Sequence, residues 1–173
     1  HFGGLMLSGI FQTFVRDRTF VPFGVCRNMP LPELADFLHA IKQASLEVDE
    51  IPVILGGVQE GGISGSILRR RGFTILPKQM GLAASRQAEE DAYLAAATAA
   101  REWKHIGMDM LYGPVMDVNV NPDNQEVGAR SLGDDPEVCA RLGTQFIRAF
   151  AEANVISTAK HFPGRGRGRV DAH

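Results

Sequence analysis

The sequence predicts an α/β fold in which a parallel sheet is covered by helices. Short apolar segments alternate with longer segments of helical periodicity, which gives four apolar segments along the chain. The apolar segments are continuous rather than alternating, which is typical of parallel strands buried on both faces. Glycine and polar residues follow the strands at residues 56–62, 117–130 and 160–173. Parallel α/β folds place their functional sites at this end of the strands.

Four apolar segments are expected to form the strands, and three segments between them are expected to form helices. A helix over residues 31–48 is indicated by apolar residues that recur close to every 3.6 positions, and an alanine-rich helix is expected over residues 87–105. A third helix is expected over residues 134–153, because Asp135 can cap its free N–H groups and Pro136 suits the first helical position. The expected strands are residues 3–10, 51–57, 108–118 and 154–162.

The length of the chain leaves two architectures open. The 173 residues are enough for one well-buried domain, whereas a complete (β/α)₈ barrel needs about 250 residues. The chain is therefore expected to be either a small, doubly wound open sheet or about the first half of a barrel.

Composition excludes several classes of protein. Lys and Arg number 18 against 20 Asp and Glu, so a net charge of −2 gives no general attraction to nucleic acid or to an anionic membrane. No apolar run approaches the roughly 20 residues that a membrane-spanning helix needs. The two cysteines, Cys26 and Cys139, are far apart and have no metal-ligand spacing, which favours a reducing compartment and a cytoplasmic location. Because the chain begins with His1 rather than Met, secretion after loss of a leader stays open.

The segment "KHFPGRGRGRVDAH", residues 160–173, invites four interpretations. A phosphate loop would need Lys-Ser or Lys-Thr after its glycines, and a dinucleotide fingerprint would need a third glycine at a different position. An arginine–glycine tract for nucleic acid would be longer and basic overall, so a solvated loop with charges facing water is the simpler interpretation. A metal site built on Asp171 and His173 lacks a third ligand that the sequence can name.

Acid–base catalysis is the fourth interpretation. If residues 171–173 are extended, Asp171 and His173 point to the same side, and the carboxylate can bond one ring nitrogen and leave the other free to move a proton. The ordinary histidine pKa near 6.5 suits proton transfer near neutral pH. Taken alone, however, such a pair is more often a structural hydrogen bond.

Five sequence blocks together resemble glycoside hydrolase family 3, and in particular its bacterial β-N-acetylglucosaminidase branch. Their order and spacing match from about residue 51 to the end, whereas the first fifty residues match weakly. The blocks are "QEGG" (59–62), "GFTILP" (72–77), "GPVMDVNVNPDN" (113–124), "GARSLGDDPE" (128–137) and the segment 160–173.

The resemblance implies a (β/α)₈ TIM-barrel-like catalytic domain, which is the N-terminal domain of the family. Residues 1–173 would form about the first half of this domain. It implies removal of terminal β-linked N-acetylglucosamine with retention of configuration, from peptidoglycan-derived fragments. The expected partner is a carbohydrate substrate, with no nucleic acid or membrane, and no metal or organic cofactor is implied.

The resemblance also assigns roles to residues. His173 is expected to be the acid/base, and Asp171 to orient it. For Arg130 and Lys160 the alternative is an ordinary strand-end salt bridge, and for Asp117 a structural role is as open as a binding role. The expected sugar-binding residues are Arg130, Lys160, His161 and Asp117. Glu60 is not expected to be the nucleophile, and the two glycines after it are expected to form a tight turn.

The sequence departs from the family pattern at several positions. The usual aspartate before "QEGG" and arginine after it are replaced by Val58 and Ile63, so the grip on the sugar should be weaker or the preferred sugar different. The family's histidine in its FPG-His-Gly motif is Arg165 here.

The aspartate nucleophile of the family lies on a later strand, beyond residue 173. We therefore expect these 173 residues alone not to complete the double displacement that retention requires, and we expect the remaining half of the barrel in C-terminal sequence. The alternatives are a β-glucosidase or glycoside phosphorylase of the same family, or a non-catalytic carbohydrate-binding relative.

Overall fold

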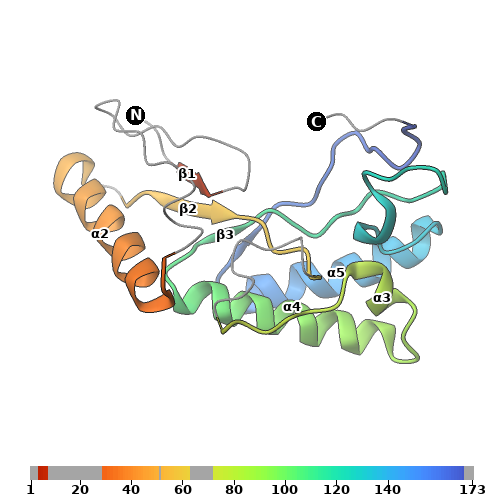
Figure 1. The fold of residues 1–173 in the computed structure, drawn as a ribbon, viewed down its shortest axis with the longest axis horizontal. Helices are drawn as coiled ribbons and strands as arrows, with labels where there is room; N and C mark the ends of the chain where they lie inside the picture. The colour runs from red at the N-terminus through yellow and green to blue at the C-terminus, as the bar shows by residue number, and fades with distance from the viewer. Residues whose placement is uncertain (1–3, 8–28, 51, 63–71, 170–173) are drawn as a thin grey trace.

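A computed structural model describes residues 4–7, 29–50, 52–62 and 72–169. Its centre is a four-stranded parallel sheet with the strand order β1-β2-β3-β4 (Figure 1). The order follows the sequence without reversal, as in a barrel, whereas a doubly wound sheet reverses its order at a switch point. The strands are β1 (Gly4–Leu7), β2 (Ile54–Gly57), β3 (Met110–Leu111) and β4 (Ile156–Ser157).

Strands β2, β3 and β4 are shorter than predicted. The strand expected over residues 108–118 pairs only at Met110–Leu111, because the chain then turns at Gly113 and reaches Pro114, which has no N–H to donate. The two chain segments nevertheless stay side by side. Val115 forms an isolated parallel bridge with Lys160, whose carbonyl accepts from the Met116 N–H at 2.6 Å.

All three predicted helices are confirmed. They are α2 (Leu31–Asp49), α4 (Ala88–His105) and α5 (Pro136–Glu152). The Asp135 carboxylate caps α5 as expected, accepting from the N–H groups of Glu137 at 2.8 Å and Val138 at 3.4 Å. Two short helices were not predicted: α3 (Gln79–Ala83) and the 3₁₀ helix η1 (Gly128–Arg130).

The hydrophobic core lies between the sheet and the helices, which cover one side of it in Figure 1. Alanines on α4 let this helix approach α5 closely, and Phe146 meets Phe150 edge to face with 6.1 Å between ring centres. The indole N–H of Trp103 donates to the Met110 carbonyl oxygen at 2.9 Å, which ties α4 to β3. The largest fully buried side chains are those of Trp103, Phe150, Leu34, Leu38, Leu55, Ile106, Met108, Leu111, Leu132, Leu142 and Val115.

Gln79 fixes the short helix α3 to the segment that follows β3. Its buried side-chain amide donates to the Val115 carbonyl oxygen at 2.8 Å and accepts from the Val115 N–H at 2.9 Å. These two bonds satisfy both backbone polar groups of Val115, which is buried.

At the amino ends of the strands, Asp109 joins the sheet to two helices. Its carboxylate accepts from the Leu55 N–H at 3.0 Å and from Lys42 of α2 at 2.7 Å, and Lys104 of α4 lies 3.8 Å away. None of the helices in the described part of the chain is long and apolar enough to cross a membrane.

Candidate functional site at the carboxyl ends of the strands

The loops that leave β2, β3 and β4 bring together four of the six predicted site residues. Arg130 and Lys160 contact the buried carboxylate of Glu60, and His161 contacts the buried carboxylate of Asp117. The remaining two, Asp171 and His173, lie outside the described residues, as does Ile63, one of the departures from the family pattern.

Glu60 is the centre of the first group. Its carboxylate, 7% exposed, forms a bidentate pair with Arg130, with Nε–Oε2 at 2.7 Å and an NH2–Oε1 distance of 3.0 Å. Lys160 Nζ contacts the same Oε1 atom. Burial by itself raises the pKa of Glu60, but the hydrogen bond from Arg130 and the charge of Lys160 outweigh it and hold the pKa below its ordinary value of 4.5. Glu60 is therefore a carboxylate that positions two cations, and the strand-end salt bridge expected as an alternative is present.

The turn after Glu60 requires glycine, as predicted. Gly61 and Gly62 have φ angles of 72° and 68°, and a Cβ atom on Gly61 would overlap the Pro77 carbonyl oxygen. The Gly62 N–H donates to the Leu76 carbonyl oxygen at 2.7 Å. The turn thereby fixes the chain at the point where Glu60 enters the site.

Asp117 is the centre of the second group. Its side chain is fully buried; Oδ2 lies 2.5 Å from His161 Nδ1, and Oδ1 accepts from the Arg165 N–H at 2.6 Å. A carboxylate on Nδ1 sets the orientation of the imidazole and leaves Nε2 for another partner. The geometry gives Asp117 a positioning role.

The segment 164–169 packs on the loop 117–130 through its backbone. The side-chain amide of Asn124 donates to the Arg165 carbonyl oxygen at 2.7 Å, and that of Asn121 donates to the Gly168 carbonyl oxygen at 2.8 Å. Gly166 is buried, and a Cβ atom there would overlap the Val118 carbonyl oxygen. The segment is thus mostly exposed, as a solvated loop would be, but Gly166 is buried and the backbone is held by two asparagine side chains.

The three arginines of that segment differ from one another. Arg165 forms an ion pair with Glu126, whose side chain is 5% exposed, and so does not face water alone. Arg167 and Arg169 are exposed, as the solvated-loop interpretation predicted.

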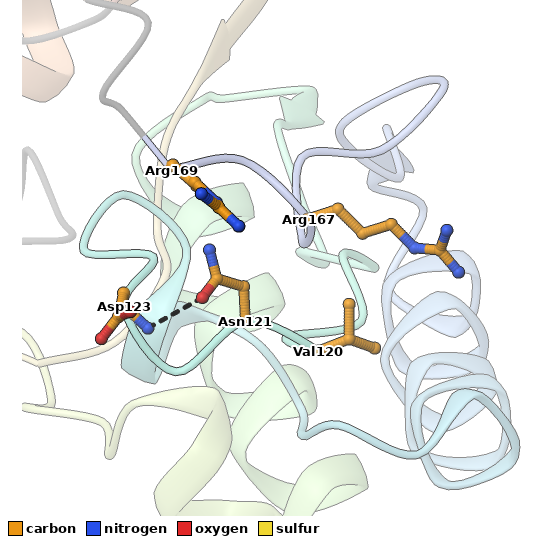
Figure 2. Close-up of a pocket in the computed structure, with 5 residues that line it drawn as sticks. All are labelled: Val120, Asn121, Asp123, Arg167 and Arg169. Atoms are coloured by element: carbon orange, nitrogen blue, oxygen red, sulfur yellow. Dashed lines mark hydrogen bonds between the residues drawn. The ribbon is translucent and has the colours of Figure 1, made fainter.

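Two cavities adjoin these loops. One, of about 560 Å³, is lined by a set that includes Asp117, Lys160 and His161. The other, of about 720 Å³, is lined by Val120, Asn121, Asp123, Arg167 and Arg169 (Figure 2). Both volumes fall in the range of small-molecule sites. In the described part of the chain, no group of three or more His, Cys, Asp or Glu side chains has an arrangement that could hold a metal ion.

Three functional features were missed by the sequence analysis. Glu60 was considered only as a nucleophile and not expected to act as one, although an acid just after a strand, with Arg130 and Lys160 following later strands, was a usable signal. The asparagines that hold the segment 164–169 and the Glu126–Arg165 pair carried no local pattern that could identify them.

Comparison with known sequences decides the family. The family model of the glycosyl hydrolase family 3 N-terminal domain matches residues 19–173. The chain belongs to glycosyl hydrolase family 3. It is 36% identical over 121 residues to a β-hexosaminidase of Pseudomonas aeruginosa, a match that covers 70% of this chain and 36% of that protein.

Solved structures of the family have the same fold. A family 3 β-N-acetylglucosaminidase from Paenibacillus sp. FPU-7 is 36% identical with a TM-score of 0.77, and the match covers 84% of this chain and 27% of that one. NagZ from Neisseria gonorrhoeae is 26% identical with a TM-score of 0.74, covering 99% of this chain and 45% of that one. The chain thus spans less than half the length of these relatives, and its parallel sheet is part of a TIM-barrel-like fold.

Proposed function

We propose that the protein containing this chain is a glycosidase that removes terminal β-linked N-acetylglucosamine with retention of configuration. The names of its family 3 relatives, β-hexosaminidase and β-N-acetylglucosaminidase, support this class of reaction. The observation that carries the proposal is the pairing of Arg130 and Lys160 on the buried carboxylate of Glu60.

This pairing suits the recognition of a sugar. Arginine and lysine only donate hydrogen bonds, so their remaining N–H groups can bind hydroxyl oxygens. Arg130 is held at three points, because its NH1 group also donates to the Glu126 carbonyl oxygen at 2.9 Å. A donor fixed in this way binds a hydroxyl in one orientation without first losing side-chain freedom.

The second group would add a further contact. Asp117 holds His161 through Nδ1, so Nε2 would face a sugar hydroxyl. His173 would give a proton to the glycosidic oxygen and then act as a base toward water, with Asp171 orienting its ring. Retention also needs a carboxylate nucleophile on the opposite face of the sugar, which we assign to sequence that follows residue 173.

Hydrolysis of 4-nitrophenyl β-N-acetylglucosaminide by protein produced from the complete coding sequence tests the proposal. His173→Ala should lower kcat/KM by about 100-fold or more for a substrate with a poor leaving group, and by less for 4-nitrophenol, which needs little proton donation. Arg101→Ala, which removes an exposed arginine on α4, is the matched control.

Other outcomes would separate the alternatives. Binding of N-acetylglucosamine without turnover would contradict the proposal and favour a carbohydrate-binding relative. Faster turnover with phosphate than with water as acceptor would instead identify a phosphorylase. An equal loss of activity for good and poor leaving groups would remove His173 from the acid role.

A further inference from the structure

The residues that lead into α3 hold the turn after Glu60. The Leu76 carbonyl oxygen accepts from the Gly62 N–H at 2.7 Å. Pro77 lies so close to Gly61 that a Cβ atom on this glycine would overlap the proline carbonyl oxygen. The segment that brings the first carboxylate into the site therefore rests on the residues just before α3.

Two further parts of the site are connected to α3 itself. The helix packs on η1, whose last residue is Arg130. In addition, the side-chain amide of Gln79 bonds both backbone polar groups of Val115, at 2.8 and 2.9 Å. Val115 is two residues before Asp117, the centre of the second group. One short element thus contacts the segments that carry each part of the site.

The segment around Val115 is bonded on two sides. The Lys160 N–H donates to the Pro114 carbonyl oxygen at 3.0 Å, and the Met116 N–H donates to the Lys160 carbonyl oxygen at 2.6 Å. Val115, between these two residues, directs its own N–H and carbonyl groups to Gln79 instead. The backbone of Lys160 is therefore connected to α3 through a single layer of chain.

These contacts form a closed loop around the Glu60 carboxylate. Lys160 Nζ reaches Glu60 from the segment that Gln79 holds, and Glu60 itself stands on the turn that rests on the residues before α3. Gln79 is 3% exposed, and a buried amide costs desolvation free energy unless its donor and acceptor are both paired. Its two bonds set the spacing between the parts of the site, and donors that bind one ligand from separate segments need a fixed spacing.

We propose that Gln79 is a positioning residue of the sugar site, which fixes Lys160 relative to Glu60 and Arg130 without touching the substrate. This inference rests on the proposed glycosidase function and adds to it a residue that lies beneath the site. Gln79 acts through the backbone of the neighbouring segment, so its removal changes the geometry of the cations and leaves their number unchanged.

Substitution of Gln79 in protein from the complete coding sequence tests the role. Gln79→Leu should lower kcat/KM for 4-nitrophenyl β-N-acetylglucosaminide by about 10-fold to 100-fold per folded molecule, because small displacements of binding groups have effects of this size. Urea unfolding gives the folded fraction. Gln87→Leu is the matched control, since it makes the same change at an exposed position before α4 and should leave kcat/KM unchanged.

A double-mutant cycle separates positioning from a general loss of structure. In the Lys160→Met background, Gln79→Leu should lower kcat/KM by less than about threefold, because the group that it positions is absent. In the Arg101→Ala background, the same substitution should have its full effect. Equal losses in the Lys160→Met and wild-type backgrounds would overturn an action through Lys160.

Gln79→Glu carries the test if the leucine variant does not fold. A carboxylate only accepts hydrogen bonds, whereas a protonated carboxyl group has a donor and an acceptor, as the amide does. The ratio of kcat/KM for this variant to that for the wild type should therefore rise as pH falls from about 7.5 to about 5, since burial favours the protonated form. A ratio that stays constant over this range would overturn the inference.

The outcomes also distinguish this inference from the function on which it rests. An unchanged kcat/KM in folded Gln79→Leu would overturn the positioning role and leave the glycosidase intact. A wild type that hydrolyses no N-acetylglucosaminide would overturn the glycosidase proposal and this inference with it.

Discussion

Two acidic side chains at opposite ends of the sheet organise their surroundings in different ways. At the amino ends of the strands, Asp109 binds the Leu55 N–H and draws on lysines of α2 and α4. At the carboxyl ends, Glu60 binds Arg130 and Lys160, which come from the segments that follow two later strands. Asp109 therefore joins helices to the sheet, whereas Glu60 joins loop segments to one another.

The exposure of the two carboxylates shows what each pair contributes. The Asp109 side chain is 21% exposed and one of its lysines 48%, so solvent screens these pairs and their contribution to stability is small. Glu60 is 7% exposed and carries two cations at once. Burying the Glu60 carboxylate with its two cationic partners costs desolvation free energy. The packing of the helices does not depend on this cluster. In α/β barrels the amino end serves stability and the carboxyl end serves function, and these residues follow that division.

The largest expected effect is that of removing the charge of Glu60, which tests its difference from Asp109. Glu60→Gln should lower kcat/KM for N-acetylglucosaminide hydrolysis by about 100-fold, because the neutral amide holds Arg130 and Lys160 less firmly and a charge-assisted hydrogen bond contributes about 1.5–3 kcal/mol. Steady-state kinetics on protein from the complete coding sequence gives the measurement.

Asp109→Asn is the matched control at the other end of the sheet. It should lower the free energy of unfolding by about 1 kcal/mol and leave kcat/KM per folded molecule unchanged. An equal loss of activity in both variants would remove the distinction between the two ends.

A second prediction concerns the close contact between Gly166 and the Val118 carbonyl group. Gly166→Ala should lower the free energy of unfolding by about 1–3 kcal/mol, since its methyl group would overlap the Val118 carbonyl oxygen. Gly81→Ala in α3 adds the same atoms where the nearest neighbour is 3.8 Å away, and should be nearly neutral. Urea unfolding of both variants makes the comparison, and a neutral Gly166→Ala would show that the loops can separate at no cost.

The smallest effect is the pH dependence that Glu60 imposes. Because its pKa in the folded state is below the ordinary 4.5, the stabilisation by its charge is fully present above that value and is lost as pH falls through the folded pKa. The difference in unfolding free energy between wild type and Glu60→Gln should therefore be constant from pH 7 to about pH 5.5 and shrink below about pH 4.5. A difference that stays constant at lower pH would show that the charge of Glu60 contributes nothing to folding.

The helices were predictable because their signals are local. The apolar periodicity and the Asp135–Pro136 start lie within each segment, so α2, α4 and α5 agree with the prediction to within about two residues. Helix α3 has only five residues, which is too few to show a period, and it is held by Gln79 rather than by propensity.

The strand limits and the site depended on information that is not local. An apolar run over residues 108–118 does not reveal that only two of its residues pair, since pairing depends on where the neighbouring strands end. The structure brings Arg130 and Lys160 together on Glu60, and this arrangement depends on partners that are 70 positions or more from Glu60 in the sequence. Polar partners at such separations are visible only in three dimensions.

The pair of bonds from Gln79 to Val115 has a consequence for variation at this position. A side-chain amide here copies the donor and acceptor of a peptide group, at a reach that no other residue type reproduces. Glutamate would offer two acceptors and meet the Val115 N–H alone, asparagine would be one carbon too short, and leucine would leave both backbone groups without a partner. Glutamine is therefore the one residue type that satisfies both Val115 backbone groups from position 79 at neutral pH. The restriction comes from hydrogen-bond chemistry rather than from side-chain size or polarity.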